Sequence, residues 1–202
     1  MATWTPQAAD SASSSSAATL DRARTRVAAE SFAAALAARL HGDTAVSSPL
    51  SGSGDPSPAA EDPGASSIEV VDLANLGGAV IEGSPEVDAA LATVRDATVL
   101  VVATPVYKAG YTGLLKAFLD RLAGGALAGV LAIPFTVAGS PIHRLVADVH
   151  LRPLLVELGA TVPTRAFTVE EPDLNDLAPV VDRWLDDNAR LVRDLVSSST
   201  RL

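Results

Sequence analysis

The most informative run of apolar positions lies between residues 99 and 122. Residues 99–103 are apolar without interruption, and so short a run is typical of a strand buried on both faces of a parallel sheet. Pro105 has no amide hydrogen to donate to a neighbouring strand, so the strand should end there. From Thr112 onward, leucine and phenylalanine recur at helical spacing. The pattern therefore predicts a buried strand, a loop and a helix.

Apolar patterns elsewhere predict helices and strands in alternation. Two helix starts carry capping residues, Ser84 with Pro85 and Ser140 with Pro141, and Pro153 should bend the second of these helices. Alternation of this kind is typical of an α/β domain with a parallel sheet. The expected helices span residues 22–40, 86–96, 141–158 and 176–196, and the further strands span 67–73, 130–135 and 160–169.

Two segments show no apolar periodicity. Residues 1–20 are small and polar with four consecutive serines, and residues 43–67 are rich in serine, proline and glycine. The first composition favours disorder and the second a flexible insertion. We therefore expect an unstructured N-terminus at 1–20 and a single domain at 21–202, with a flexible insertion at 43–67.

Composition narrows the possible partners and chemistry. The formal net charge is −9 and the 15 basic residues are scattered, which argues against nucleic acid. No apolar run reaches the ~18 residues of a membrane span, and residues 1–20 lack the features of a signal peptide, so we expect a cytoplasmic protein without membrane contact. The chain has no cysteine, and His143 and His150 have no carboxylate four residues away, so no metal site is expected.

The loop at residues 105–113 is the strongest candidate for a ligand site. In open α/β sheets, ligands bind beyond the carboxyl end of a central strand, which is where this loop is expected. Gly110 and Gly113 allow the backbone to approach a ligand closely, and Thr112 and Gly113 leave free amides at a helix start. From these residues alone, an ordinary connecting loop is the alternative interpretation.

Residues 104–122, TPVYKAGYTGLLKAFLDRL, resemble the signature P-x-Y-x-x-x-Y-[ST]-G-x-[LF]-K-x-x-[LF]-D of the NAD(P)H-dependent FMN reductases, a family with the flavodoxin-like fold. The resemblance implies that this loop contacts the flavin ring. A second family motif beside the ring, T-G-G-[ST]-x-x-H, is matched in part from Val137 onward, with Val-Ala in place of Thr-Gly. The ring contacts implied by the two motifs are Thr104, Pro105, Val106, Tyr107, Gly110, Tyr111, Thr112, Gly113, Ala138, Gly139, Ser140 and His143.

Three of these residues also have a purely structural interpretation. Ser140 could serve only as a helix cap, and Tyr111 could pack against neighbouring side chains instead of the ring. His143, one turn into the expected helix, could contact the cleft or simply pack. The sequence leaves these alternatives open.

The phosphate end of the implied FMN site departs from the family pattern. The family begins with a buried strand and a loop, G-[SN]-P-x-x-x-S-R-[ST], that holds the FMN phosphate. Only Arg24 and Thr25, expected at the head of the first helix, resemble the end of that loop and are the implied phosphate contacts. The family sheet has five strands in the order 2-1-3-4-5, and this chain supplies four. The first strand is either degenerate, at residues 2–5, or missing.

The resemblance implies an NAD(P)H-dependent FMN reductase. Hydride passes from nicotinamide to flavin when the two rings stack, so no catalytic side chain is expected. Many relatives supply reduced FMN to a partner monooxygenase. Residues 148–153, D-V-H-L-R-P, resemble a family segment at subunit contacts, D-Y-x-L-[KR]-P, which implies a homodimer or homotetramer. The alternatives are a quinone or azo-dye reductase, and a flavin-free scaffold or partner subunit, which the missing phosphate loop favours.

Overall fold

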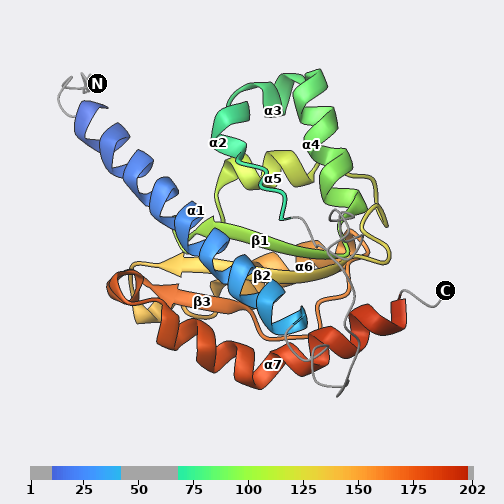
Figure 1. The fold of residues 1–202 in the computed structure, drawn as a ribbon. Helices are drawn as coiled ribbons and strands as arrows, with labels where there is room; N and C mark the ends of the chain where they lie inside the picture. Colours follow the sequence, from blue (N-terminus) through green and yellow to red (C-terminus); the bar gives the residue numbers. More distant parts are fainter. Residues whose placement is uncertain (1–10, 42–67, 200–202) are drawn as a thin grey trace, which may run out of the picture.

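A parallel sheet of three strands organises the described part of the protein, which comprises residues 11–41 and 68–199 of a computed structural model (Figure 1). The strands are β1 (Val99–Pro105), β2 (Leu131–Ala138) and β3 (Phe167–Glu170), in the order β1-β2-β3. Val99 is opposite Leu131, and Phe135 is opposite Phe167. Among the described residues, no strand pairs with the other edge of β1.

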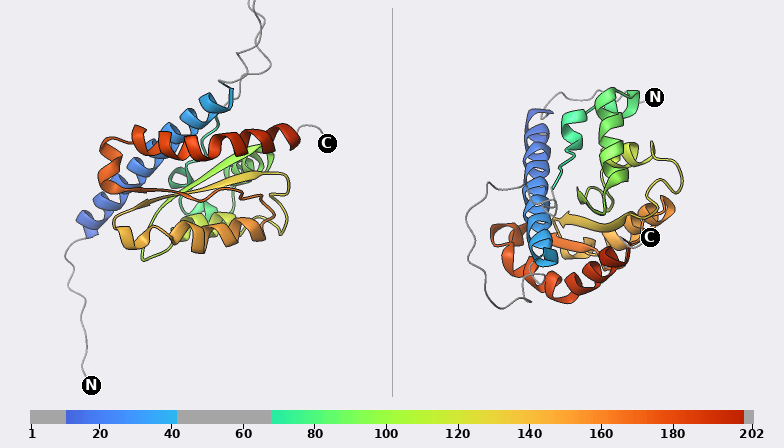
Figure 2. Two further views of the ribbon diagram at one scale, coloured as in Figure 1. Left: turned by 90° about the horizontal axis from the view of Figure 1, so that it is seen from below. Right: turned by 45° about the vertical axis from the view of Figure 1, so that its right-hand side comes forward.

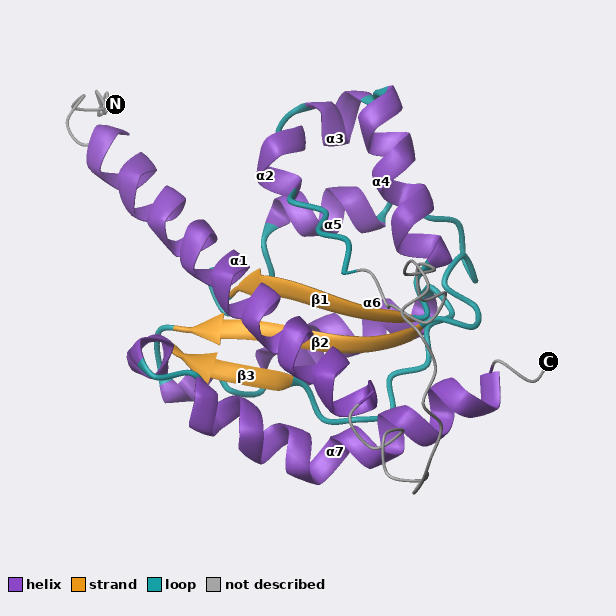
Figure 3. Ribbon diagram, viewed as in Figure 1, coloured by secondary structure: helices purple, strands orange, loops and turns teal. Residues whose placement is uncertain are grey.

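Helices cover both faces of this sheet, so the fold has three layers (Figures 2 and 3). On one face, α1 (Ser11–His41) crosses the strands and packs beside α7 (Ala178–Ser199). On the other face lie α4 (Pro85–Asp96), α5 (Gly113–Leu119) and α6 (Arg152–Glu157). The short elements are α2 (Leu73–Leu76), α3 (Ala79–Glu82), the 3-10 helices η1 (Pro141–His143) and η3 (Glu171–Asn175), and the π-helix η2 (Ala147–Leu151).

The two faces of the sheet bury different side chains. All eight residues of β2 are buried, as expected for a central strand of continuous hydrophobicity. The face toward α1 and α7 holds an aromatic cluster in which Phe32 and Phe167 stack with ring centroids 4.4 Å apart, while Phe135 and Trp184 meet them at tilted or edge-on angles. The core on the opposite face is mostly aliphatic and includes the buried ring of Phe118.

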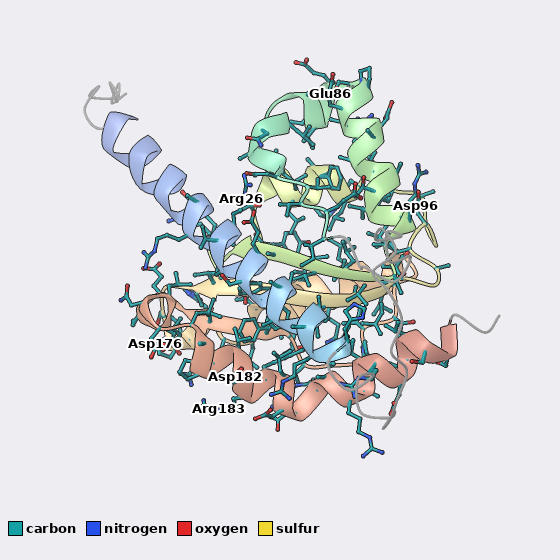
Figure 4. The ribbon with its side chains drawn as sticks, viewed as in Figure 1. Arg26, Glu86, Asp96, Asp176, Asp182 and Arg183 are labelled. Atoms are coloured by element: carbon teal, nitrogen blue, oxygen red, sulfur yellow. The ribbon has the colours of Figure 1, made fainter. Side chains whose placement is uncertain are left out.

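The prediction of a strand at residues 67–73 is wrong. Residues 68–72 form no strand, and α2 begins at Leu73. In the order 2-1-3-4-5, the second strand pairs only with the first, and the described residues contain no first strand for it to join. Asp72 instead caps α2 by accepting from the Ala74 amide at 3.0 Å, and it pairs at 3.1 Å with Arg26, which projects from α1 (Figure 4).

The expected helix at residues 141–158 is divided into three pieces, η1, η2 and α6. Pro153 has no amide to donate to the carbonyl of Val149, so the regular helical ladder is interrupted there. In η2 the ladder lengthens by one residue, and the Arg152 amide donates to the carbonyl of Ala147. The predicted bend is therefore a π-helix followed by a new α-helix.

The last predicted strand, at 160–169, is shorter in the structure. Only Phe167–Glu170 forms strand β3, and Thr161 makes a single bridge to Leu131. Arg152 holds the intervening segment by donating to the carbonyls of Val162, at 2.7 Å, and Thr164. These bonds take up carbonyls that a longer strand would otherwise present to its neighbour.

The first helix starts earlier than expected. It begins at Ser11 rather than near residue 22, so the expectation of an unstructured segment is wrong for residues 11–20. The sequence from 7 to 41 contains neither glycine nor proline and is rich in alanine, which favours a continuous helix. The expected strand at 2–5 and insertion at 43–67 lie outside the described residues, as does the part of the disorder prediction that covers 1–10.

The other expected elements are confirmed with small shifts of their ends. Ser84 caps α4 by accepting from the Val87 amide at 3.3 Å, and Thr112 caps α5 in the same way. None of the helices in the described ranges is both long and apolar enough to cross a membrane.

Candidate functional site

Two loops lie side by side where β1 and β2 end. The Val106 amide donates to the carbonyl of Val137 at 2.8 Å, which continues the pairing of the two strands by one residue. The loop after β1, residues 106–112, is thereby held next to the loop after β2, residues 139–143. The sequence predicted that both loops border one site, and the structure brings them together at the edge where open α/β sheets bind ligands.

A tight turn forms the tip of the first loop. Tyr107 and Gly110 exchange two backbone hydrogen bonds, of 2.8 and 3.0 Å. The two residues between them, Lys108 and Ala109, have φ angles of 50° and 58°, in the left-handed region that side chains other than glycine seldom adopt. Tyr107 is 67% exposed. The turn therefore presents an aromatic ring to solvent from a constrained backbone, as a ligand contact would require.

Thr104 fastens the base of this loop. Its side chain is only 1% exposed, and its hydroxyl accepts from the Thr112 amide at 3.2 Å and donates to the carbonyl of Pro105 at 3.1 Å. Both ends of the loop are thus joined through one hydroxyl group. Thr104, expected as a ring contact, has its side chain committed to supporting the loop.

Thr104→Val should loosen this loop while keeping the side-chain volume. The Thr112 amide would lose its partner, which should lower the free energy of unfolding by about 1–3 kcal/mol and weaken binding of FMN. Urea denaturation and an FMN fluorescence titration would measure the two effects. Thr98→Val, at an exposed position just before β1, is the control and should change the unfolding free energy by less than about 0.5 kcal/mol.

Two glycines leave room beside this loop. A Cβ atom added at Gly113 would meet nothing within 4 Å, and one added at Gly110 would meet only the carbonyl of Tyr107, at 3.8 Å. Tyr111 is half-buried and packs on the aliphatic core, in agreement with the structural alternative for this residue. Pro105 and Val106 are also half-buried, at the end of β1.

The second loop is built differently from the expectation. Ser140 makes no side-chain capping bond, and the helix that follows is a single 3-10 turn in which the His143 amide donates to the carbonyl of Ser140 at 3.0 Å. The expected α-helix start is therefore absent at this point, and so is most of its dipole. Ala138 is fully buried in the sheet, whereas Gly139 is exposed and His143 half-buried.

The expectation that Arg24 and Thr25 begin a helix is wrong. They lie within α1, more than three turns from its start, so their backbone amides are inside the helix and unavailable to a phosphate. Thr25 is buried. Arg24 nevertheless reaches the edge where the strands end, because its Nη2 donates to the carbonyl of Glu171 at 3.3 Å. Arg24 thus remains a candidate anion contact through its side chain.

Sequence reasoning missed Glu171. This residue follows β3 directly, and its carboxylate oxygen Oε1 would lie 3.0 Å from a Cβ atom added at Gly139. A signal was present, because the residue follows the last predicted strand at the same edge of the sheet as both loops. Glu171 lies outside both family motifs, so the resemblance did not identify it.

The site suits the ring of FMN better than its phosphate. The open space at Gly113, the exposed ring of Tyr107 and the adjoining Gly139 loop could accept a flat heteroaromatic group. For the phosphate, the described residues offer the side chain of Arg24 but no glycine-rich loop at a helix start. No group of three or more potential metal ligands occurs in the ranges described.

The class of protein follows from the fold and the site. The chain has a flavodoxin-like α/β architecture with paired loops at the carboxyl edge of a parallel sheet. The family model for NADPH-dependent FMN reductase matches residues 57–172, which is more than half of the chain. The protein belongs to this family.

Individual relatives agree with that assignment. An FMN reductase (NADPH) of Escherichia coli K12 is 42% identical over 77 residues, covering 38% of this chain and 40% of the relative. The NADH-dependent FMN reductase SfnF of Pseudomonas fluorescens Pf0-1 is 36% identical over 107 residues, covering 51% and 57%. The matches thus span about half the length of these relatives or less.

One solved structure resembles almost the whole chain. It is an oxidoreductase from Corynebacterium diphtheriae, 29% identical, with a TM-score of 0.66 over 88% of this chain and 90% of that one. The likeness therefore extends beyond the segment that the family model matches.

Proposed function

We propose that this protein is an NAD(P)H-dependent FMN reductase. The observation that carries the proposal is the hydrogen bond from Val106 to Val137, which sets the loop bearing the family signature beside the Gly139 loop. FMN would bind with its ring at these loops and with Arg24 facing its phosphate. Membership of the family supports the same reaction.

The chain's own residues would bind and orient the reactants. FMN, when bound, accepts a hydride at its N5 atom from the nicotinamide, so the protein needs no nucleophile or general base. Thr104 keeps the signature loop in shape through its two hydrogen bonds, and the Tyr107 ring can shield one side of the flavin from water. Positioning and exclusion of water are then the catalytic contributions of the protein.

A flavin-loading experiment tests this proposal. The protein is mixed with excess FMN, desalted and examined for absorbance near ~450 nm, and oxidation of NADH and NADPH is followed with and without added FMN. FMN-dependent oxidation of either nucleotide is expected. Its absence would favour the flavin-free scaffold or partner subunit, which the lack of a phosphate loop in the described residues supports. Adding quinones or azo dyes as acceptors would test the remaining alternative.

We also propose that two or four copies of the chain assemble. Four apolar residues between η1 and the end of α6 are exposed: Ile142, Leu145, Val149 and Val156 are 83, 67, 57 and 54% exposed. Val149 lies within residues 148–153, whose motif resembles a family subunit contact, and the other three lie on either side of that segment. Light scattering of Leu145→Glu should show dissociation, whereas the same change at the isolated exposed position Ile81 should leave the mass of the assembly unchanged.

A cytoplasmic location and a partner monooxygenase complete the proposal. The cytoplasm supplies the NAD(P)H that the reaction consumes, and reduced FMN would pass to the monooxygenase. Support for the partner comes from the family resemblance. An anaerobic binding experiment with candidate monooxygenases, using protein loaded with reduced FMN, would test it.

A further inference from the structure

The carboxylate of Glu171 covers part of the Gly139 loop. Ala138 and Glu170 are opposite each other in the β2–β3 ladder, so Gly139 and Glu171 are the next residues on each side. A Cβ atom at Gly139 would lie 3.0 Å from Oε1 and 3.7 Å from Cδ of Glu171. The side chain is therefore placed over the backbone of a loop that borders the proposed flavin site.

In the part of the chain that the structure describes, the Glu171 carboxylate has no hydrogen-bond or ion-pair partner. The adjacent Glu170 is paired with Arg144, and Arg24 donates to the backbone carbonyl of Glu171 rather than to its carboxylate. Within residues 23–41 and 68–198, no hydrogen bond or ion pair to the Glu171 carboxylate is formed. The side chain is also half-buried, so water screens its charge less than that of a fully exposed glutamate.

The proposed reaction adds charge to the flavin beside this carboxylate. The C4–H bond of the nicotinamide breaks, and the hydrogen leaves with both electrons and forms an N–H bond at flavin N5. The nicotinamide becomes oxidised and positive, and the flavin becomes reduced and gains one negative charge. A ring held at the Gly139 loop would lie within about 10 Å of the Glu171 carboxylate, because neighbouring strands are about 4.8 Å apart. Repulsion then acts on reduced FMN more strongly than on oxidised FMN.

We propose that Glu171 lowers the affinity of the site for reduced FMN relative to oxidised FMN and so promotes release of the product. This inference rests on the proposed function. The FMN phosphate has the same charge before and after hydride transfer, so its interaction with Glu171 cancels in the ratio of the two affinities. At the effective dielectric constant of a protein surface, like charges about 8–10 Å apart would change that ratio about 15- to 35-fold in the absence of salt. Screening over a Debye length of about 8–10 Å reduces the expected change to about three- to tenfold.

Binding of the two forms of FMN tests the inference. Dissociation constants are measured for oxidised FMN by fluorescence and for photoreduced FMN under anaerobic conditions, together with the midpoint potential of bound FMN. In Glu171→Gln, reduced FMN should bind about three- to tenfold more tightly, oxidised FMN should change less than about twofold, and the potential should rise. Glu171→Asp keeps the charge and should retain most of the wild-type ratio.

Asp173→Asn is the matched control, because it removes the same charge from an exposed position of the same short helix, η3. Because this charge is exposed to water and salt, its removal should change the ratio less than about twofold. Glu171→Gln could leave the ratio of the two affinities unchanged, or it could weaken binding of oxidised and reduced FMN equally. Either result would overturn the role of Glu171 while the reductase proposal stands. If the wild-type protein binds neither form of FMN, both proposals fail.

Discussion

Gly113→Asp should abolish uptake of FMN without unfolding the protein. A side chain at this position meets nothing within 4 Å, so the change creates no clash. Gly113 is the first residue of α5, where a carboxylate interacts favourably with the helix dipole by about 0.3–1 kcal/mol. The same carboxylate would occupy the space beside the signature loop that the flavin ring is proposed to fill. We expect the affinity for FMN to fall at least about 100-fold, or about 2.7 kcal/mol.

Gly124→Asp provides the control for this experiment. Gly124 is also exposed with nothing within 4 Å of an added Cβ atom, but it lies outside both loops of the site. Fluorescence titration should show wild-type affinity for this variant, and circular dichroism should show that both variants are folded. Unchanged FMN binding by Gly113→Asp would remove the signature loop from the flavin site.

Arg152→Met should destabilise the fold by removing a partly buried ion pair and two bonds to backbone carbonyls. Arg152 binds Asp148 through Nε at 3.1 Å and Nη2 at 2.6 Å, and it donates to the carbonyls of Val162 and Thr164. Asp148 also accepts from the Ala166 amide at 3.2 Å. Because both side chains are about three-quarters buried, methionine should cost about 2–3 kcal/mol, or roughly 5–10 °C in Tm.

Arg190→Met is the control for Arg152→Met, because it makes the same substitution at an exposed position. Its side chain is 92% exposed and lies 3.9 Å from Asp194, so Arg190→Met should change stability by less than about 0.5 kcal/mol. The melting temperature of Arg152→Lys should lie between those of Arg152→Met and Arg190→Met, because lysine keeps the charge but cannot form several bonds in fixed directions. Equal melting temperatures for Arg152→Met and Arg190→Met would contradict the proposed role of the network.

The elements that the sequence predicted well are those whose patterns are local. The run at 99–103, the cap at Ser84 and the helix start near Thr112 are local patterns, and the structure confirms the strand and both helix starts. The cap expected at Ser140 is not formed. The strand expected at 67–73 failed because a strand needs a neighbour, and a pattern of alternating side chains does not show whether one exists. The missed Glu171 has a similar cause, since its position beside Gly139 depends on the pairing of β2 with β3.

The signature loop also contains a contact that could not be predicted from a local pattern. The sequence placed the loop correctly, but it could not show that the Thr104 hydroxyl bonds to the Thr112 amide, eight residues away. Similarly, the start of α1 depends on how far a sequence without glycine or proline continues as a helix, which helix propensity alone does not fix.

The unequal pairing of the three strands has a consequence for hydrogen exchange. Strand β2 has a partner on each side, whereas β1 is paired along one edge only among the described residues. Amides of β1 that point away from β2 should therefore exchange with deuterated solvent well before those of β2, although both strands have the same apolar character. Mass spectrometry of peptides covering Val99–Pro105 and Leu131–Ala138 would show two rates in the first and a single slow rate in the second.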